Sequence, residues 1–371
     1  MKLNLFLAIL IMFFPSFVLS GCRKDAFNEE SFTLGDAKVA AYISTWGSWK
    51  AKNIKSQYLS DLILAFALIN KSTYSSITMS GFAGLWDEVT ELRETRPGLK
   101  ITLSVGGASE KGFSNMAADV GKRSAFIADV CAWMRRRNLD GVDIDWEFPA
   151  NAAERQNYIT LLREMRNALN DLEDENGKQY SLSTAVSAAY NASMTAAAEI
   201  ADSLKVMNYD YYGSWSNTTG HNANLYNNSR KKSDQSTDKS IRSYLNAGIP
   251  PEKIMLGVAF YGKVWNGVSP GSYEPGLFQS YTTYGTEPSW TSIKAAYLKG
   301  GSGYTRYWDD TANAPFLYNA AAKRWVTYSD GEQMRSLAAY AKEKKLGGVF
   351  AWEYNQDAGA ELLKILAENA R

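Results

Sequence analysis

Short apolar, β-rich runs recur along the chain from Lys38 onward, and most are followed by a polar turn and an amphipathic segment. Several runs are almost continuously apolar, which is expected for strands of a parallel sheet whose two faces are both buried. Eight runs predict strands at 39–44, 62–67, 100–105, 142–146, 181–186, 205–208, 255–260 and 349–352.

The amphipathic segments predict helices at about 85–95, 122–137, 237–247 and 331–345, and the clearest helix follows the fourth strand. Asn151 can cap that helix, Glu154 follows three residues later, and Gly177 lies just beyond its expected end. Alternating strands and helices indicate a parallel sheet. Eight such units in one domain-sized stretch favour a closed (β/α)8 TIM barrel over an open sheet.

Residues 263–328 interrupt this scheme between the seventh and eighth predicted strands. The segment is rich in Gly, Tyr and Trp, and it includes Trp265, Trp290, Trp308 and Trp325. We therefore expect one barrel domain over residues 38–371, which carries a small insertion beside its active face.

The N-terminus has the pattern of a targeting segment. Its apolar stretch, 5–14, follows Lys2 and is too short to span a bilayer, which is typical of a signal peptide over residues 1–21. Leu19-Ser20-Gly21-Cys22 resembles a bacterial lipoprotein cleavage site, in which the Cys becomes the lipidated first residue. An ordinary signal peptide that happens to contain a Cys is the alternative.

The polar residues 22–37 are then expected to be a tether between lipid and barrel. These features predict an exported protein that is anchored to a bacterial membrane through a lipid on Cys22. Exposure to external polysaccharide suits a position on the cell surface.

Composition and charge narrow the possible functions. The formal net charge is +1 and no long run of one sign occurs, which argues against a nucleic-acid partner. His221 is the only histidine, so a Ser-His-Asp triad or a multi-His metal site is poorly supported. His221 lies in a polar, Gly-bounded stretch and is expected to be structural. Cys131 lies on an apolar helical pattern and is expected to be a buried thiol without a disulfide partner.

The fourth predicted strand carries acids at alternate positions, Asp143, Asp145 and Glu147, after Asp140. Because side chains alternate between strand faces, the three share one face, about 6.5–7 Å apart along the strand. Clustered buried carboxylates are costly unless protons are shared, and they raise the proton affinity of at least one member. A Glu can thereby stay protonated near neutral pH and act as a general acid. Glu147 is nearest the carboxyl end of the strand, where barrel enzymes place their chemistry.

A metal site is the rival interpretation of this acidic pattern. A calcium loop would need polar turn residues and a central Gly between its ligands. The intervening residues here are Ile144 and Trp146, which favour a strand instead. We therefore expect no metal.

At these residues the sequence resembles glycoside hydrolase family 18, the chitinase family. The family signature Asp-x-x-Asp-x-Asp-x-Glu is present as Asp140, Asp143, Asp145 and Glu147. Shorter motifs follow the family order, namely Tyr42 with Trp46, Ser104-Val-Gly106-Gly107, Met207-Asn-Tyr209-Asp210, Phe260-Tyr261-Gly262 and Gly347 through Trp352. The resemblance extends from about residue 38 to about residue 357.

The resemblance implies a retaining, substrate-assisted mechanism in which the substrate's own N-acetyl oxygen attacks the anomeric carbon. It implies that Glu147 protonates the leaving oxygen and then activates water. Asp145 is expected to hold the acetamido N–H, and Asp143 to share a proton with Asp145. Tyr209 is expected to hydrogen-bond the acetamido carbonyl and position it for attack.

The same resemblance implies a set of supporting residues. Asp210 contacts the same sugar or raises the proton affinity of Glu147, Ser104 and Tyr42 support Asp143 from below, and Trp352 forms the apolar floor. The substrate-binding residues expected in this way are Asp210, Trp352, Tyr42, Trp146, Tyr261 and Ser104. The mechanism needs no cofactor.

The expected function is hydrolysis of β-1,4-linked N-acetylglucosamine polymers, either chitin or chito-oligosaccharides, by a monomer. An endo-β-N-acetylglucosaminidase that cuts the chitobiose core of N-glycans is an alternative with the same chemistry. The Trp-rich segment 260–325 and the Asp-Trp-Glu-Phe run favour chitin. A non-catalytic sugar-binding lipoprotein is the alternative of another class, and the presence of Glu147 and Asp145 argues against it.

Overall fold

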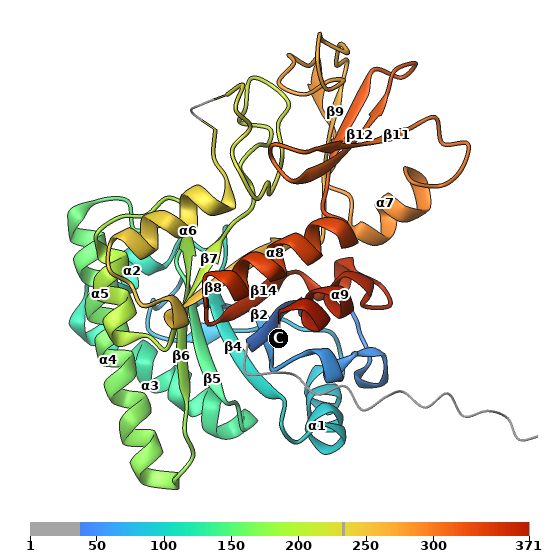
Figure 1. Ribbon diagram of the computed structural model, residues 1–371. Helices are drawn as coiled ribbons and strands as arrows, with labels where there is room; N and C mark the ends of the chain where they lie inside the picture. Colours follow the sequence, from blue (N-terminus) through green and yellow to red (C-terminus); the bar gives the residue numbers. More distant parts are fainter. Residues whose placement is uncertain (1–37, 232–233, 371) are drawn as a thin grey trace, which may run out of the picture. The chain divides into compact units, whose positions relative to one another are not determined.

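The computed structural model describes residues 38–231 and 234–370, in which eight parallel strands form a closed barrel (Figure 1). The barrel strands are β1 (Lys38–Ser44), β2 (Asp61–Ile69), β4 (Lys100–Gly106), β5 (Gly141–Asp145), β6 (Ser181–Ser187), β7 (Ser203–Met207), β8 (Ile254–Ala259) and β14 (Gly348–Trp352). Their order is β1-β14-β8-β7-β6-β5-β4-β2, and pairing of β1 with β2 closes the ring. The TIM barrel is therefore confirmed, and each strand overlaps its predicted range. A short strand, β3 (Ile77–Thr78), pairs antiparallel with the end of β2.

Helices cover the outer side of the barrel, and α3, α4 and α5 lie side by side along it (Figure 1). The helices are α1 (Leu85–Thr95), α2 (Phe113–Ala117), α3 (Val120–Arg137), α4 (Ala152–Asn176), α5 (Ser193–Ile200), α6 (Thr237–Asn246), α8 (Gly331–Glu343) and α9 (Glu361–Asn369). Short 3-10 turns are η1 (Ala51–Asn53), η2 (Ser56–Tyr58), η3 (Pro251–Lys253) and η4 (Tyr354–Gln356).

Helix α4 follows β5, the strand that carries the acidic residues. Capping interactions at its two ends define where the helix begins and ends. The Asn151 side chain accepts a hydrogen bond of 2.9 Å from the backbone N–H of Glu154. Gly177 adopts φ +72° just past the last turn, a conformation that glycine tolerates without steric cost. These caps fix where the chain leaves the carboxyl end of β5 and begins to return along the outside of the barrel.

The segment between β8 and β14 contains a separate five-stranded antiparallel sheet (Figure 1). Its strands, in the order β10-β9-β13-β12-β11, are β10 (Thr283–Tyr284), β9 (Lys263–Asn266), β13 (Arg324–Thr327), β12 (Ala314–Asn319) and β11 (Thr305–Asp309), with α7 (Trp290–Ala296) between β10 and β11. Trp265 and Trp325 are fully buried with their rings tilted against each other, and Trp325 stacks on Phe316. This aromatic core accounts for two of the tryptophans that interrupt the barrel pattern.

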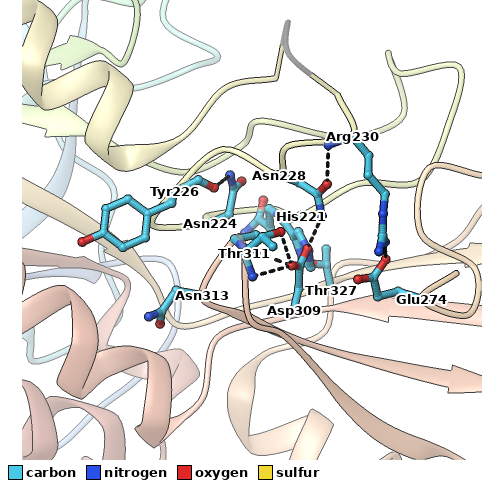
Figure 2. Close-up of polar contacts among 12 residues, drawn as sticks. His221, Asn224, Tyr226, Asn228, Arg230, Glu274, Asp309, Thr311, Asn313 and Thr327 are labelled. Carbon is cyan, nitrogen blue, oxygen red and sulfur yellow. Dashed lines mark hydrogen bonds and ion pairs between the residues drawn. The ribbon is translucent and has the colours of Figure 1, made fainter.

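A buried polar cluster joins this sheet to the loop that follows β7 (Figure 2). His221 Nε2 lies 2.9 Å from Asp309 Oδ2, and the Asn228 side-chain amide donates to the same oxygen at 2.7 Å. The hydroxyl of Thr311 donates to Asp309 Oδ1 at 2.8 Å. Burial raises the pKa of Asp309, but the hydrogen bond and charge of His221 and the other donors outweigh it, so the pKa lies below its usual range. This placement agrees with the structural role predicted for His221.

Several sequence predictions concern residues outside the described ranges. The signal peptide over 1–21, the lipidated Cys22 and the tether over 22–37 all lie there. Across the part of the chain that the structure describes, no helix is both long and apolar enough to cross a bilayer. Cys131 is buried within α3, as predicted.

Candidate active site

Asp143 lies deepest in the acidic row and accepts four hydrogen bonds. Strand register places it between Ser104 on β4 and Ser183 on β6, and both hydroxyls donate to its carboxylate, at 2.8 and 2.6 Å. The Tyr42 hydroxyl donates to Oδ2 at 2.8 Å, and Lys205 Nζ lies 3.0 Å from Oδ1. Burial alone raises the pKa of Asp143, but the Lys205 charge and the hydroxyl donors overcome it and hold the pKa below its usual range.

Asp145 lies one step closer to the carboxyl end and has the opposite environment. It is buried, and its Oδ1 has no hydrogen-bond partner among the described residues. Burial, followed by the charges of Glu147 and Asp143, raises its pKa well above the usual range, and Lys205 offsets only part of this. This environment therefore favours the neutral form of Asp145, in contrast to Asp143.

Glu147 follows the end of β5, where the acidic row reaches a cavity of about 380 Å³. Burial first, and then the negative charge of Asp210, raise the pKa of Glu147 to about 7, while the Lys111 charge acts against this. A carboxyl group with this pKa is protonated in about half of the molecules at neutral pH. It can therefore donate a proton to a bound group and afterwards accept one.

Aromatic rings form the apolar wall of the cavity. Trp352, the last residue of β14, stacks on Phe66 with ring centres 5.4 Å apart and planes inclined by 17°. Phe66 also stacks on Trp46, which is 63% exposed although it is a large aromatic side chain. Such flat apolar surfaces suit the faces of sugar rings, whose C–H groups are also apolar.

Tyr209 and Asp210 bring the loop after β7 to the other side of the cavity. Both residues line it, and the Asp210 backbone has φ +60°, a left-handed conformation that Asp tolerates better than most residues. The Tyr261 hydroxyl donates to Asp210 Oδ1 at 2.6 Å, and Lys263 Nζ lies 2.6 Å from the same oxygen. Lys263 is almost fully buried and also lies 4.5 Å from the centre of the Trp215 ring.

Backbone conformation and close contacts explain why the Ser-x-Gly-Gly motif at the end of β4 has two consecutive glycines. Gly106 has φ +131°, and a Cβ on it would lie 2.0 Å from the carbonyl oxygen of Asp145. Gly107 has φ +91°, and a Cβ there would lie 2.6 Å from the Phe66 ring. Side chains at either position would displace the backbone of Asp145 or the aromatic wall.

The structure brings most of the expected residues to one place, but not all to the cavity. The expected residues that line it are Tyr42, Asp145, Glu147, Tyr209, Asp210 and Trp352. Ser104 and Asp143 lie beneath it and are fully buried, and Tyr261 acts on Asp210. Asp140 is also outside the cavity, because its carboxylate binds Arg93 at 2.7 Å and Lys178 at 2.9 Å.

The expected contact between Trp146 and substrate is wrong. Trp146 is buried, stacks on Phe113 with ring centres 5.2 Å apart, and meets Tyr158 of α4 edge-on. Alternation along β5 turns this side chain toward the helices, while Asp145 and Glu147 turn inward. Its role is packing between the barrel and α2 and α4.

Two lysines in the site were not expected from the sequence, Lys205 beneath Asp143 and Lys263 beside Asp210. The available signal for Lys205 was a charged residue inside an otherwise apolar strand. Lys263 lies two residues after Tyr261, on a strand of the insertion whose existence was not predicted. Within residues 38–231 and 234–370, no group of three or more His, Cys, Asp and Glu side chains is arranged to hold a metal ion.

Comparisons with known proteins agree on one protein family. The sequence model of glycosyl hydrolases family 18 matches residues 38–357. Chitinase A1 of Niallia circulans is 33% identical over 349 residues, which cover 85% of this chain and 50% of that protein. Chitinase A of Pseudoalteromonas piscicida is 30% identical and is covered over 42% of its length. The chain thus spans about half the length of these curated relatives.

Solved structures agree with the fold. A family 18 N-acetylglucosaminidase from Paenibacillus barengoltzii superposes with a TM-score of 0.80 and 31% identity, covering 90% of this chain and 99% of that one. A family 18 chitinase from Cycas revoluta in complex with (GlcNAc)3 has a TM-score of 0.80 and 26% identity, with coverage of 90% and 99%.

The charge on Asp210 offers a direct test of the environment of Glu147. Because this charge raises the pKa of Glu147, Asp210→Asn should lower that pKa from about 7. Carbon-13 NMR of protein labelled at the Glu side-chain carboxyl carbon measures the titration, and Glu147→Gln assigns the signal. Asp171→Asn, which removes an exposed acid from α4, serves as the control and should leave the midpoint unchanged. An equal midpoint in Asp210→Asn and native protein would contradict this electrostatic assignment.

Proposed function

This chain belongs to glycosyl hydrolases family 18, and we propose that it is a retaining glycosidase that hydrolyses β-1,4 linkages in chitin or chito-oligosaccharides. The observation that carries this proposal is the placement of Glu147, Asp145 and Tyr209 around one cavity with Trp352 in its wall. An acid whose pKa is raised to about 7, a second acid whose pKa is raised, and a phenol there face an apolar surface, which is the set of groups that cleavage of a 2-acetamido sugar requires.

In the first step, Glu147 donates its proton to the glycosidic oxygen as the bond to the anomeric carbon breaks. The substrate's acetamido oxygen attacks that carbon, so the electron pair comes from the substrate and the leaving sugar departs as an alcohol. Tyr209 donates a hydrogen bond to the acetamido oxygen and aims it at the carbon. Asp145 accepts a hydrogen bond from the acetamido N–H, which gains positive charge as the ring closes.

In the second step, the ionised Glu147 removes a proton from water, which opens the oxazolinium ring and restores the acetamido group. Attack occurs on the face opposite to the new ring bond, so the product keeps the original β configuration. Glu147 is protonated again at the end of the cycle. Its pKa of about 7 suits both roles, because neither protonation state is strongly favoured near neutral pH.

Chitin is the substrate class that the cavity surroundings support best. Trp46 and Trp215 are 63% and 62% exposed. Trp46 stacks on Phe66 in the cavity wall, and Trp215 lies against Lys263, the partner of Asp210. Repeated stacking platforms suit a polymer of one repeated sugar. The relatives from Niallia circulans and Pseudoalteromonas piscicida are named chitinases, and the Cycas revoluta structure holds (GlcNAc)3.

The acid role of Glu147 predicts a specific kinetic defect. Glu147→Gln should lower kcat on N-acetylglucosamine oligomers by about 100- to 10,000-fold, because it removes the proton donor. Binding of the same oligomers, followed by tryptophan fluorescence, should remain within a few-fold of native. Glu175→Gln, which changes an exposed carboxylate on α4, is the matched control and should retain full turnover. Undiminished kcat in Glu147→Gln would remove Glu147 from the mechanism.

Paired assays separate chitin from N-glycan cores. We expect release of short N-acetylglucosamine products from chito-oligosaccharides and little cleavage of a high-mannose glycopeptide. Preferred cleavage of the glycopeptide would instead support the endo-β-N-acetylglucosaminidase. Release of single N-acetylglucosamine units from a chain end would indicate an action like that named for the Paenibacillus barengoltzii enzyme.

We also propose that the chain is exported and attached to a bacterial membrane through a lipid on Cys22. The support is the sequence Leu19-Ser20-Gly21-Cys22 after an apolar stretch. The native protein should fractionate with membranes and lose its first 21 residues, and Cys22→Ala should remain unlipidated. Native protein recovered without lipid on Cys22 would contradict the proposal.

A further inference from the structure

Lys205 is a buried cation that the mechanism above does not use. It lies on β7 in the barrel interior, and its side chain is 1% exposed. Its ammonium group donates hydrogen bonds to Asp143 Oδ1 and to the hydroxyl of Ser183. A buried ammonium is strongly destabilising without a carboxylate partner, so Lys205 and Asp143 form an obligatory pair.

The hydrogen bonds around Asp143 have a defined direction because Lys205 can only donate. Since the Ser183 oxygen accepts from Lys205, the Ser183 hydroxyl proton is free to point to Asp143 Oδ1. The other carboxylate oxygen receives the hydroxyls of Tyr42 and Ser104. Each oxygen of Asp143 therefore accepts two hydrogen bonds, which leaves no position for a proton on this carboxyl group.

Asp145 lies next along the strand and lacks such donors. Its Oδ1 is buried without a hydrogen-bond partner in the described structure, and it faces the charges of Asp143 and Glu147. A single proton shared by the two aspartates is therefore far more stable on Asp145. This differs from the sharing between Asp143 and Asp145 that the family resemblance implies.

We propose that Lys205 is a positioning residue, the counter-ion that keeps Asp143 ionised and thereby assigns the proton of the aspartate pair to Asp145. Its role in catalysis rests on the proposed function, whereas the charge assignment does not. After Glu147 has given its proton to the leaving oxygen, the neutral Asp145 can donate a hydrogen bond to the new Glu147 carboxylate. The other oxygen of Asp145 remains an acceptor for the acetamido N–H, so no proton has to move between the aspartates.

Other titratable groups interact electrostatically with Asp143, and all of them remain unchanged in the Lys205 variants. They are Tyr42 from β1, Asp61 from β2, Asp145 from β5, Tyr158 from α4 and Tyr209 after β7. Unlike these groups, Lys205 is a cation. Its removal should therefore raise the pKa of Asp143.

Carbon-13 NMR of the full chain, labelled at the Asp carboxyl carbons, tests the charge assignment without any need for turnover. Asp143→Asn and Asp145→Asn assign the two signals. In the native protein, Asp143 should be ionised and Asp145 protonated at neutral pH. Lys205→Met should raise the titration midpoint of Asp143 by about 1–3 pH units, and Lys205→Arg should keep it near native. Lys253→Met is the control, because it removes a lysine that donates only to backbone carbonyls of Ala198 and Ala201.

The pH profile of kcat/KM supplies the catalytic readout. In Lys205→Met, the acid limb of the profile should shift to higher pH together with the Asp143 midpoint. The alkaline limb, which Glu147 sets, should stay at its native pH. A variant harmed only in folding would lose activity at every pH and would leave both limbs unmoved.

Two results would overturn the proposal. One is a native Asp143 that is protonated at neutral pH, which can be observed even if Lys205→Met does not fold. The other is an Asp143 midpoint that Lys205→Met leaves unchanged. A native chain with the expected carboxyl signals but no hydrolysis of N-acetylglucosamine oligomers would instead refute the proposed function and leave the charge assignment standing.

Discussion

The repulsion among acidic side chains at alternate positions of one buried strand is the constraint on which the rest of the site depends. Asp143, Asp145 and Glu147 point into the same interior, where burial makes each negative charge costly. The barrel resolves this cost differently at each depth. Lys205 and hydroxyl donors hold the pKa of the deepest acid below its usual range, burial and neighbouring charges raise the pKa of the middle acid well above its usual range, and the pKa of the outermost acid is raised to about 7.

The different pKa values of the three acids result from how the barrel and the insertion pack around them. Closure of the barrel brings β1, β4, β6 and β7 around β5, and each contributes one donor to Asp143. The insertion acts on the other wall, since Lys263 on β9 holds Asp210, whose charge in turn raises the pKa of Glu147. The buried pair of His221 and Asp309 ties the loop that carries Tyr209 and Asp210 to the same insertion (Figure 2). The environment of Glu147 therefore depends on contacts between segments far apart in the sequence.

Much of the barrel could be predicted because burial and strand periodicity are local properties. Apolar runs located all eight barrel strands, and alternation within the fourth placed Asp143, Asp145 and Glu147 on one face. The same alternation turns Trp146 toward the helices, so its expected contact with substrate was wrong. Contacts across the barrel were not predictable in this way. The partner of Lys205 depends on strand stagger, and the strands of the insertion lie among aromatic residues without a clear period.

The anomeric configuration of the first product tests the proposed chemistry most directly. Proton NMR during the earliest hydrolysis of a defined N-acetylglucosamine oligomer distinguishes the two anomers before they equilibrate in water. Attack by the acetamido oxygen, followed by water on the opposite face, predicts that the β anomer forms first. Initial formation of the α anomer would mean that water attacks the anomeric carbon directly, and it would contradict the roles assigned to Asp145 and Tyr209.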